Sequence, residues 1–550
     1  MAGIIMKSGT EEVAPPDRVW YTGSPSTWKF RPNHSREQLT SLRSTIKDTR
    51  VSLVLTDKTN RVCAMPPDLL STQLNNHFND GWRELDHDPS PQLEKKANKL
   101  LLDCLSHIGV SMSSNSYLCN RLKTRYTWAP PAYPLAKDHK EGFPHTKVRI
   151  VQPVRGSAIE HLDVLCGIVL NQLKPSLTYR VESTNDFIAS RLHSLPSPEP
   201  TDHLYQVSLD MVSMYPTLPT GDRALGVIRD YLATHSVDTL GLPVEDIISM
   251  LSFVFRHTYA RTGTGRDTRY YHALKGVGTG YHSSAPFAEI IADFTYKQAL
   301  ASLEPQHHPL SLALYVDDSH STWWGPDAHG PLLTALNNVW PGELAFTVEQ
   351  CQEGQLSFLD LWIDLRGPTV EYEMYQKPTH SGQYLHFYSH CPTQTKLNIV
   401  STEAKRILDL CSNMERAWPH LENLRRNMVS SGYPLDKVSI IIARVVHKHL
   451  HPRLVHTARN RDPRFMLKVP FTNDCALRLM RSAVARSGLS IRVVPTSGTK
   501  ISSIIKREHC QRSPTRERCY SPQCVFHDRD MDCQKTHVVY EGTCIHCGDK

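Results

Sequence analysis

Apolar and polar positions alternate with two different periods along the 550-residue chain, and proline- or glycine-containing stretches separate the segments. Short runs rich in β-branched and aromatic residues predict strands at 204–209 (LYQVSL), 311–316 (SLALYV) and 356–365 (LSFLDLWIDL). Longer stretches with helical spacing predict helices within 157–195, 221–260 and 393–490. Between them, GVGTGYHSS is a glycine-rich loop that opens into a further helix. The pattern therefore indicates an α+β protein.

Carboxylates interrupt two of the predicted strands. Asp210 ends the first strand, and Asp317 and Asp318 follow the second, with apolar residues on both sides that predict a hairpin. Each could be a simple turn residue, because Asp bonds its own backbone and tolerates bends. If the strands are neighbours in one sheet, however, the three carboxylates would repel one another unless cations neutralised them. Such an oxygen-rich site suits two hard cations and substrate phosphates.

Two further features accompany these carboxylates. Tyr215 follows Asp210 by five residues, and the glycine-rich loop with its helix lies between Asp210 and the YVDD sequence. The order of strand aspartate, glycine-rich loop and YVDD resembles motifs A, B and C of reverse transcriptases. Longer stretches resemble Penelope-like retroelements: LVLTDKTNRV (with Thr59 in place of a family glycine), PPAYPLAKDHKEG, LYQVSLDMVSMYPTLPT, LSFLDLWID, YQKPTHSGQYLHFYSHCP and TKLNIVSTEAKRILDLC, which contains Arg406 at the place of a family arginine.

The resemblance implies roles for individual residues. Asp210, Asp317 and Asp318 would be catalytic ligands of two Mg²⁺ or Mn²⁺ ions, and Tyr215 would exclude a 2′-hydroxyl. The remaining substrate-binding residues implied are Lys137, Lys140 and Arg149 for the triphosphate, Gly280 and Ser284 (with Ala288) in motif B, and Lys377 for the primer or leaving phosphate. The three finger cations could instead be ordinary surface charges, and Lys377 a simple loop lysine. Two family positions differ, with Ala273 for a common Gln and Thr279 for a common Met.

The fold class implied is an α+β right-hand polymerase with an antiparallel palm sheet, a helical thumb, an N-terminal helical extension and a zinc-binding tail. The corresponding ranges are 1–125 for the N-terminal extension with the start of the fingers, 126–390 for fingers and palm, 391–495 for the thumb and 496–550 for the Cys/His-rich tail.

Charge is unevenly distributed along a chain of otherwise ordinary composition, with 40% hydrophobic and 21% charged residues. The net charge is +7, and residues 401–550 hold 26 Lys and Arg against 14 Asp and Glu. A basic C-terminal third suggests a polyanion partner, although a solvated basic face is also common. No apolar run of about 18 residues occurs, so no membrane partner is expected.

Six of the 14 cysteines lie between Cys510 and Cys547. The spacing Cys524-x2-His527, then Cys544-x2-Cys547, predicts a structural Zn²⁺ site with two ligands on each of two turns. Rival ligands are Cys519, Cys533 and His537, and unligated thiols are the alternative. In Penelope-like proteins a GIY-YIG nuclease commonly follows a segment like THVVYEGTCIHCGDK. Because the sequence stops at Lys550 before any YIG, no nuclease activity is expected.

The function expected is therefore RNA-directed DNA polymerisation by a Penelope-like retrotransposon protein, primed at a target site or telomere. Its partners would be template RNA, primer DNA and dNTPs, and its location would be nuclear. Two alternatives remain. A viral-type RNA-dependent RNA polymerase shares the palm but tends to carry Asp at the place of Tyr215 and Gly at that of Val316. The second alternative is a non-catalytic RNA-binding protein with a decayed polymerase fold. The presence of all three aspartates argues against it.

Overall fold

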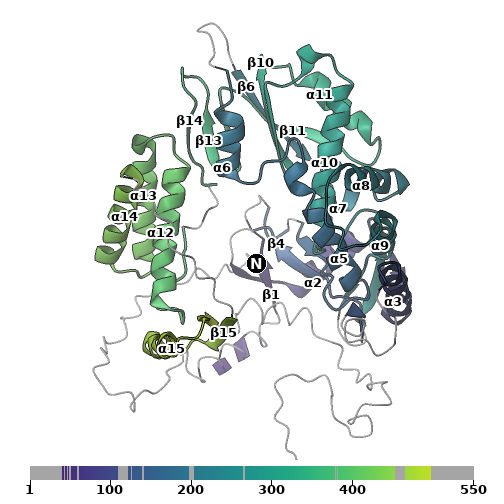
Figure 1. The fold of residues 1–550 in the computed structure, drawn as a ribbon, viewed down its shortest axis with the longest axis horizontal. Helices are drawn as coiled ribbons and strands as arrows, with labels where there is room; N and C mark the ends of the chain where they lie inside the picture. Colours follow the sequence, from purple (N-terminus) through teal and green to yellow (C-terminus); the bar gives the residue numbers. More distant parts are fainter. Residues whose placement is uncertain are drawn as a thin grey trace, which may run out of the picture.

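The computed structural model describes six single positions between 37 and 48 and then most of the chain to residue 496. The continuous ranges are 51–57, 61–109, 122–125, 127–138, 142–145, 147–196, 204–263, 267–377, 382–451 and 465–496, with position 380 in addition. Within these ranges the protein is a mixed α+β structure (Figure 1). This confirms the fold class expected from the sequence at the level of secondary structure.

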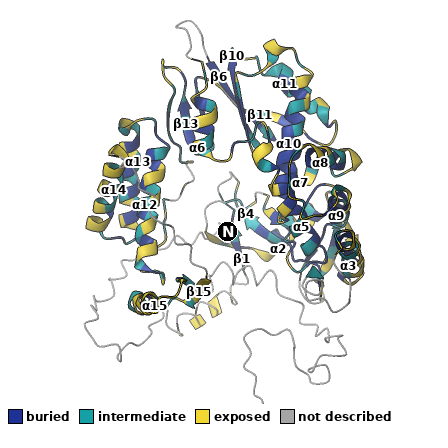
Figure 2. Cartoon of the chain, viewed as in Figure 1, coloured by how far each residue is buried: buried dark blue, intermediate teal, exposed yellow. Residues whose placement is uncertain are grey.

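A four-stranded antiparallel sheet holds the predicted carboxylate strands. Its order is β11 (Phe346–Glu353), β6 (Leu204–Met211), β10 (Asp318–Trp324) and β9 (Ser311–Tyr315). Strand β6 is buried on both faces. Val207, Leu209 and Met211 enter one hydrophobic cluster, and Leu204 enters another, beside the buried polar side chains of Gln206 and Ser208. Figure 2 shows the strands of this sheet mostly in the dark blue of buried residues.

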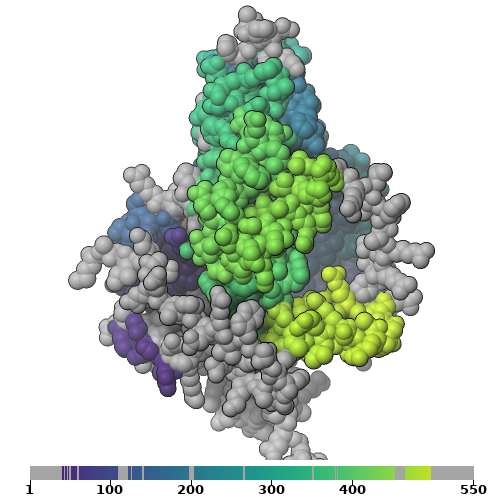
Figure 3. Space-filling view, turned by 90° about the vertical axis from the view of Figure 1, so that its left-hand side faces the viewer, coloured from purple at the N-terminus to yellow at the C-terminus, as the bar shows by residue number. Residues whose placement is uncertain are grey.

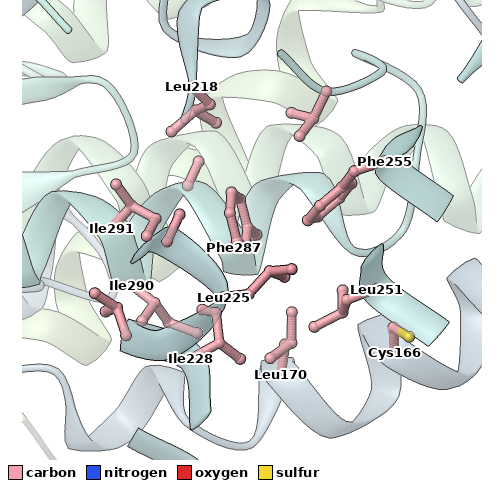
Figure 4. Packing of buried hydrophobic residues seen from close by; sticks show 14 of the residues in the cluster. Cys166, Leu170, Leu218, Leu225, Ile228, Leu251, Phe255, Phe287, Ile290 and Ile291 are labelled. Carbon is pink, nitrogen blue, oxygen red and sulfur yellow. The ribbon is translucent and has the colours of Figure 1, made fainter. Parts of the chain in front are cut away.

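Helices α10 (Ser284–Ala301) and α11 (Gly330–Val339) pack against this sheet. Helices α5 (Glu160–Asn171) and α8 (Asp222–Thr234) pack against α10, and α9 (Val244–Arg256) packs against α5 and α8. Val207 and Leu209 of β6 belong to the same buried cluster as the apolar side chains of these helices. Phe287 of α10 lies among Leu225 and Phe255 at the centre of that packing (Figure 4). Burial of this size fixes α10, and with it the end of the glycine-rich loop.

The N-terminal part does not form a separate helical extension in the described residues. It contains α2 (Pro67–Phe78) and α3 (Ser90–His107), but its strands join sheets built by later segments. One sheet has the order β2 (Val62–Met65), β1 (Ser52–Thr56), β4 (Tyr133–Ala136) and β5 (Arg149–Val151), and the other β3 (Trp82–Leu85), β8 (Arg269–Ala273) and β7 (Tyr259–Thr262). The apolar, β-branched sequence around 52–56 favours a strand that pairs with β4.

The segment LSFLDLWIDL forms a hairpin and not the single predicted strand. Its halves are β12 (Gln355–Phe358) and β13 (Leu361–Asp364), and β14 (Glu371–Met374) completes the small sheet. Leu359 adopts a φ of 53°, a left-handed conformation that reverses the chain at this point. Apolar periodicity continues through the turn and hides it from a sequence-based prediction.

Three helices follow this sheet, α12 (Thr393–Asp409), α13 (Met414–Ser430) and α14 (Leu435–Leu450). The rest of 391–495 is less helical than predicted, because β15 (Phe465–Pro470), α15 (Asp474–Arg486) and β16 (Ile491–Thr496) form a parallel β-α-β unit. Asp474 accepts hydrogen bonds from the backbone N–H and hydroxyl of Thr393, at 3.1 and 2.6 Å. The unit is therefore joined to the start of α12, and Figure 3 shows it in yellow below the three helices.

Candidate active site

The structure brings the three predicted aspartates together. Asp318, the first residue of β10, is directly opposite Asp210 in the ladder between β10 and β6. Residues opposite each other in antiparallel strands have Cα atoms about 4.5–5.5 Å apart. Asp317 occupies the turn between β9 and β10, beside Val316, whose φ is 59°. The hairpin and the strand thus place all three carboxylates at one end of the sheet.

The carboxylates act on one another electrostatically. Burial, followed by the charges of Asp317 and Glu349, raises the pKa of Asp210 above its usual value. Burial, with the same neighbours and Asp210, raises the pKa of Asp318 to about 6. The ammonium of Lys377 acts in the opposite direction on Asp318. Lys377 therefore lies within electrostatic reach of the carboxylates.

Glu349 is a fourth carboxylate that the sequence did not reveal. The register of β11 against β6 shifts between Val348 and Gln350, so Glu349 lies in a β-bulge. Its carboxylate is 3.4 Å from the hydroxyl of Ser208, which donates to it. A bulge redirects a side chain relative to the regular alternation of a strand. No feature of FTVEQCQE predicts that shift.

The donor set fits a hard divalent cation. Carboxylate oxygens are the ligands that Mg²⁺ and Mn²⁺ prefer, and carboxylates crowded in this way gain from a cation. Within the described part of the chain, no group of three or more His, Cys, Asp or Glu side chains forms a ready-made metal site. To share an ion, the carboxylates of Asp210, Asp317 and Asp318 would have to turn from the positions that they occupy here. The tail residues Cys524, His527, Cys544 and Cys547, and their rivals, lie outside the described residues.

Tyr215 lies beside this cluster. The chain leaves β6 through Ser213, whose φ of 51° turns it sharply into the short helix α7 (Met214–Thr217). Burial raises the pKa of Tyr215, and the charges of Asp317 and Glu289 raise it further, whereas the charge of Arg149 lowers it. Tyr215 is therefore within electrostatic reach of both a carboxylate of the cluster and a predicted triphosphate-binding cation.

The glycine-rich loop packs tightly against its neighbours. The N–H of Val277 donates to the carbonyl of Tyr215 at 2.9 Å. A Cβ on Gly276 would lie 2.5 Å from that carbonyl oxygen, and one on Gly280 would lie 2.6 Å from the carbonyl oxygen of Gln152. Gly280 is thus required for close contact between its backbone and that of residues 152–153 of the same chain. The loop is thereby held between residues 152–153 and the segment that carries Tyr215.

Ser284 and Ala288 lie on the buried side of α10, and Ser284 contacts the glycine-rich loop. The hydroxyl of Ser284 donates to the carbonyl of Gly278 at 2.7 Å, and both residues are buried. At the same helix terminus, the buried carboxylate of Asp163 accepts from the N–H groups of His282 and Ser283. Ser284 therefore shapes the loop in this structure and does not present its hydroxyl to a substrate.

A polar chain of contacts, missed by the sequence analysis, connects the loop to α2. The hydroxyl and N–H of Thr279 donate to the side-chain oxygen of Gln152, at 2.8 and 3.3 Å. The side-chain nitrogen of Gln152 is 3.1 Å from Nε2 of His77. Thr279, noted as a departure from the family pattern, thus makes a specific contact of its own. We call this contact chain the Gln152 latch.

The remaining predicted cations are placed as follows. Arg149 of β5 forms an ion pair of 3.2 Å with Asp57, and Lys137 follows β4 on the same face of that sheet. Lys140 lies outside the described residues. Arg406 of α12 forms an ion pair of 2.8 Å with Asp360, in the turn of the LSFLDLWIDL hairpin. This pair connects the three-helix unit to the β12-β13-β14 sheet, whose strand β12 packs against β6 and β11.

Comparisons with known proteins give one partial match and distant likenesses. The Animal helix-turn-helix domain family matches residues 383–443, which contain α12, α13 and part of α14. No curated protein matches the chain. Similar solved structures include telomerase from Candida albicans with a fragment of telomeric RNA (TM-score 0.43, 10% identity, 76% of this chain and 69% of that one) and apo telomerase from Candida tropicalis (0.42, 13%, 73% and 66%).

A third similar structure is the RNA-dependent RNA polymerase of BmCPV, with a TM-score of 0.35 and 8% identity over 69% of this chain. The chain spans about two thirds of the two telomerase chains and 32% of the viral one. None of the helices in the described ranges is long and apolar enough to cross a bilayer.

Proposed function

We propose that this protein is an RNA-directed DNA polymerase that extends a DNA 3′-hydroxyl on an RNA template. The observation that carries the proposal is the position of Asp318 directly opposite Asp210, with Asp317 in the adjoining turn. Two strands far apart in sequence thus deliver the carboxylates that two-metal nucleotidyl transfer needs. Buried strands on a double-sided core would hold them in place while substrates exchange.

The carboxylates and the residues around them would bind different parts of the substrates: the metal ions, the sugar and the triphosphate. Bound at Asp210, Asp317 and Asp318, two Mg²⁺ ions would supply activation of the primer hydroxyl and neutralisation of the leaving pyrophosphate. Tyr215, held through its carbonyl by the loop, would contact the sugar and disfavour a 2′-hydroxyl. Arg149 and Lys137 would bind the triphosphate from the neighbouring sheet, where a guanidinium can make two parallel hydrogen bonds.

We further propose that the polymerase belongs to a Penelope-like retrotransposon. The support is the run of family-like segments from Lys137 to Arg406, together with the Arg406–Asp360 pair that connects two of them. Nuclear location, target- or telomere-primed synthesis and a Zn²⁺-binding tail follow from that resemblance and are part of the same proposal. The basic C-terminal third would bind template and primer phosphates.

Primer extension tests the proposal and separates it from its rivals. The full-length chain is given an RNA template annealed to a DNA primer, Mg²⁺, and either dNTPs or NTPs. We expect extension with dNTPs, much weaker extension with NTPs, and none by Asp317→Ala. Asp327→Ala, in an exposed loop after β10, is the control and should extend normally. Equal use of NTPs would favour an RNA polymerase, and no Asp317-dependent extension would favour a non-catalytic protein.

A further inference from the structure

Two of the three predicted triphosphate-binding cations, Lys137 and Arg149, share one face of the β2-β1-β4-β5 sheet with a carboxylate. Leu135 of β4 is the register partner of Leu55 in β1 on one side and of Arg149 in β5 on the other. Side chains two residues apart along an extended chain point to the same face, so Asp57 and Lys137 lie on the face of Arg149. The opposite face carries Val54, Thr56, Ala136 and Ile150 and is buried.

Asp57 is held firmly at the end of β1. Its N–H donates to the carbonyl of Ala136 at 2.8 Å, which continues the pairing of β1 with β4 by one residue. Its side chain is only 4% exposed, whereas that of its partner Arg149 is 52% exposed. Oδ1 of Asp57 lies 3.2 Å from Nη1 of Arg149. The carboxylate is therefore the fixed member of the pair, and the guanidinium extends from it toward solvent.

The second carboxylate oxygen of Asp57 has no hydrogen-bond partner within the described residues, although it is buried. An unsatisfied buried oxygen costs stability, and burying a charge for a single ion pair rarely repays its desolvation. An apolar residue of similar size would serve a purely structural purpose better. The arrangement instead suits a residue that orients a neighbouring group for function.

We propose that Asp57 is a positioning residue for Arg149, an inference that rests on the proposed function. One carboxylate oxygen would hold one N–H of the guanidinium, so that the remaining donors of the planar fork face an incoming triphosphate. The charge of Arg149 acts on the pKa of Tyr215, so the guanidinium lies within electrostatic reach of that residue. The ligand recognised would be a nucleoside triphosphate bound with Mg²⁺.

Binding and turnover of dATP test the proposal separately. Asp57→Asn keeps the shape but removes the charge. We expect it to raise the KM for dATP about tenfold, to change kcat by less than about threefold and to leave the thermal midpoint equal or higher. Binding of Mg²⁺–dATP, measured by calorimetry without primer or template, should weaken by the same factor. In the Arg149→Lys background, Asp57→Asn should add little, because the two residues act as a unit.

Glu84→Gln is the matched control, because Glu84 pairs with Arg269 on an exposed part of another sheet. It should change neither dATP binding nor KM. Unchanged dATP binding by Asp57→Asn would overturn the proposal, as would a fall in thermal midpoint and kcat with an unchanged KM, which indicates a merely structural pair. The binding measurement does not need turnover. If wild type binds Mg²⁺–dATP but does not extend a primer, the polymerase proposal is contradicted, and the calorimetry still decides whether Asp57 positions Arg149.

Discussion

Asp318 lies directly opposite Asp210 across two buried strands, and burial together with neighbouring carboxylates raises the pKa of Asp318 to about 6. Because the two carboxylates repel each other, replacing one of them should lower activity without lowering stability. Asp318→Asn should lower primer extension about a thousandfold, because a metal ligand contributes several kcal/mol to transition-state stabilisation. In EDTA, the same variant should be at least as stable as wild type, since one repelling charge is gone.

Thermal unfolding with and without Mg²⁺ checks this prediction. Mg²⁺ should raise the midpoint of wild type, because it binds only the folded protein, and should raise that of Asp318→Asn much less. A variant that is less stable in EDTA and still stabilised fully by Mg²⁺ would show that Asp318 is a structural residue.

Tyr215 should control discrimination between deoxynucleotides and ribonucleotides. The hydrogen bond from the N–H of Val277 to the carbonyl of Tyr215, at 2.9 Å, and the tight approach of Gly276 fix the backbone that carries the ring of Tyr215. Tyr215→Val should increase the use of NTPs relative to dNTPs by about 10- to 100-fold, because steric exclusion of a hydroxyl is lost. The measurement is the ratio of kcat/KM values for dATP and ATP. Tyr215→Phe keeps the ring and should keep the discrimination; a loss in both variants would contradict a steric gate.

The sequence allowed the carboxylate strands to be predicted, because a strand aspartate, a glycine-rich loop and YVDD occur in the order of a known set of motifs, whereas the adjacent aspartates alone could have been a turn. It could not reveal Glu349, since a bulge depends on how β11 fits β6. The turn at Leu359 was missed for a related reason, because its left-handed backbone leaves the apolar pattern unbroken. Contacts between residues distant in sequence, such as Gln152 with Thr279, carry no periodic signal at all.

The Gln152 latch should contribute to stability and to nucleotide binding. Thr279→Val keeps the shape but removes the hydroxyl, which leaves Gln152 with the longer hydrogen bond from the N–H of residue 279. We expect a loss of about 1 kcal/mol in the free energy of unfolding and a higher KM for dNTPs. Urea unfolding and steady-state primer extension measure the two effects. Thr279→Ser retains the hydroxyl and should resemble wild type; equal effects of both substitutions would point to packing of the methyl group.

The latch should also make stability depend on pH through His77. The oxygen of Gln152 accepts from Thr279, so its amide nitrogen must donate to Nε2 of His77, which accepts only when the imidazole is neutral. Burial lowers the pKa of His77 below its usual 6.5, against an opposing effect of Asp80. The folded state therefore binds this proton less readily than the unfolded state. The contribution is complete above pH 6.5 and is lost as the pH falls toward the lowered value.

Wild type should therefore lose about 1 kcal/mol more of its free energy of unfolding between pH 7.5 and 5.5 than His77→Gln does. Gln can accept the hydrogen bond at either pH and does not titrate. Urea unfolding at several pH values measures the difference. Parallel pH profiles for the two proteins would show that His77 does not titrate in this range.

Val316 should be a strained residue whose replacement separates stability from activity. A β-branched residue at a φ of 59° destabilises the folded state by roughly 1–2 kcal/mol. Glycine adopts this conformation freely, but it loses more conformational entropy on folding, which costs about 0.5–1 kcal/mol. Val316→Gly should therefore be more stable than wild type by up to about 1 kcal/mol, while primer extension falls because the neighbouring Asp317 is held less firmly. Val316→Asn, which tolerates the left-handed region, should keep more activity. A large loss of stability in both variants would mean that packing of the valine against the main hydrophobic cluster outweighs the strain.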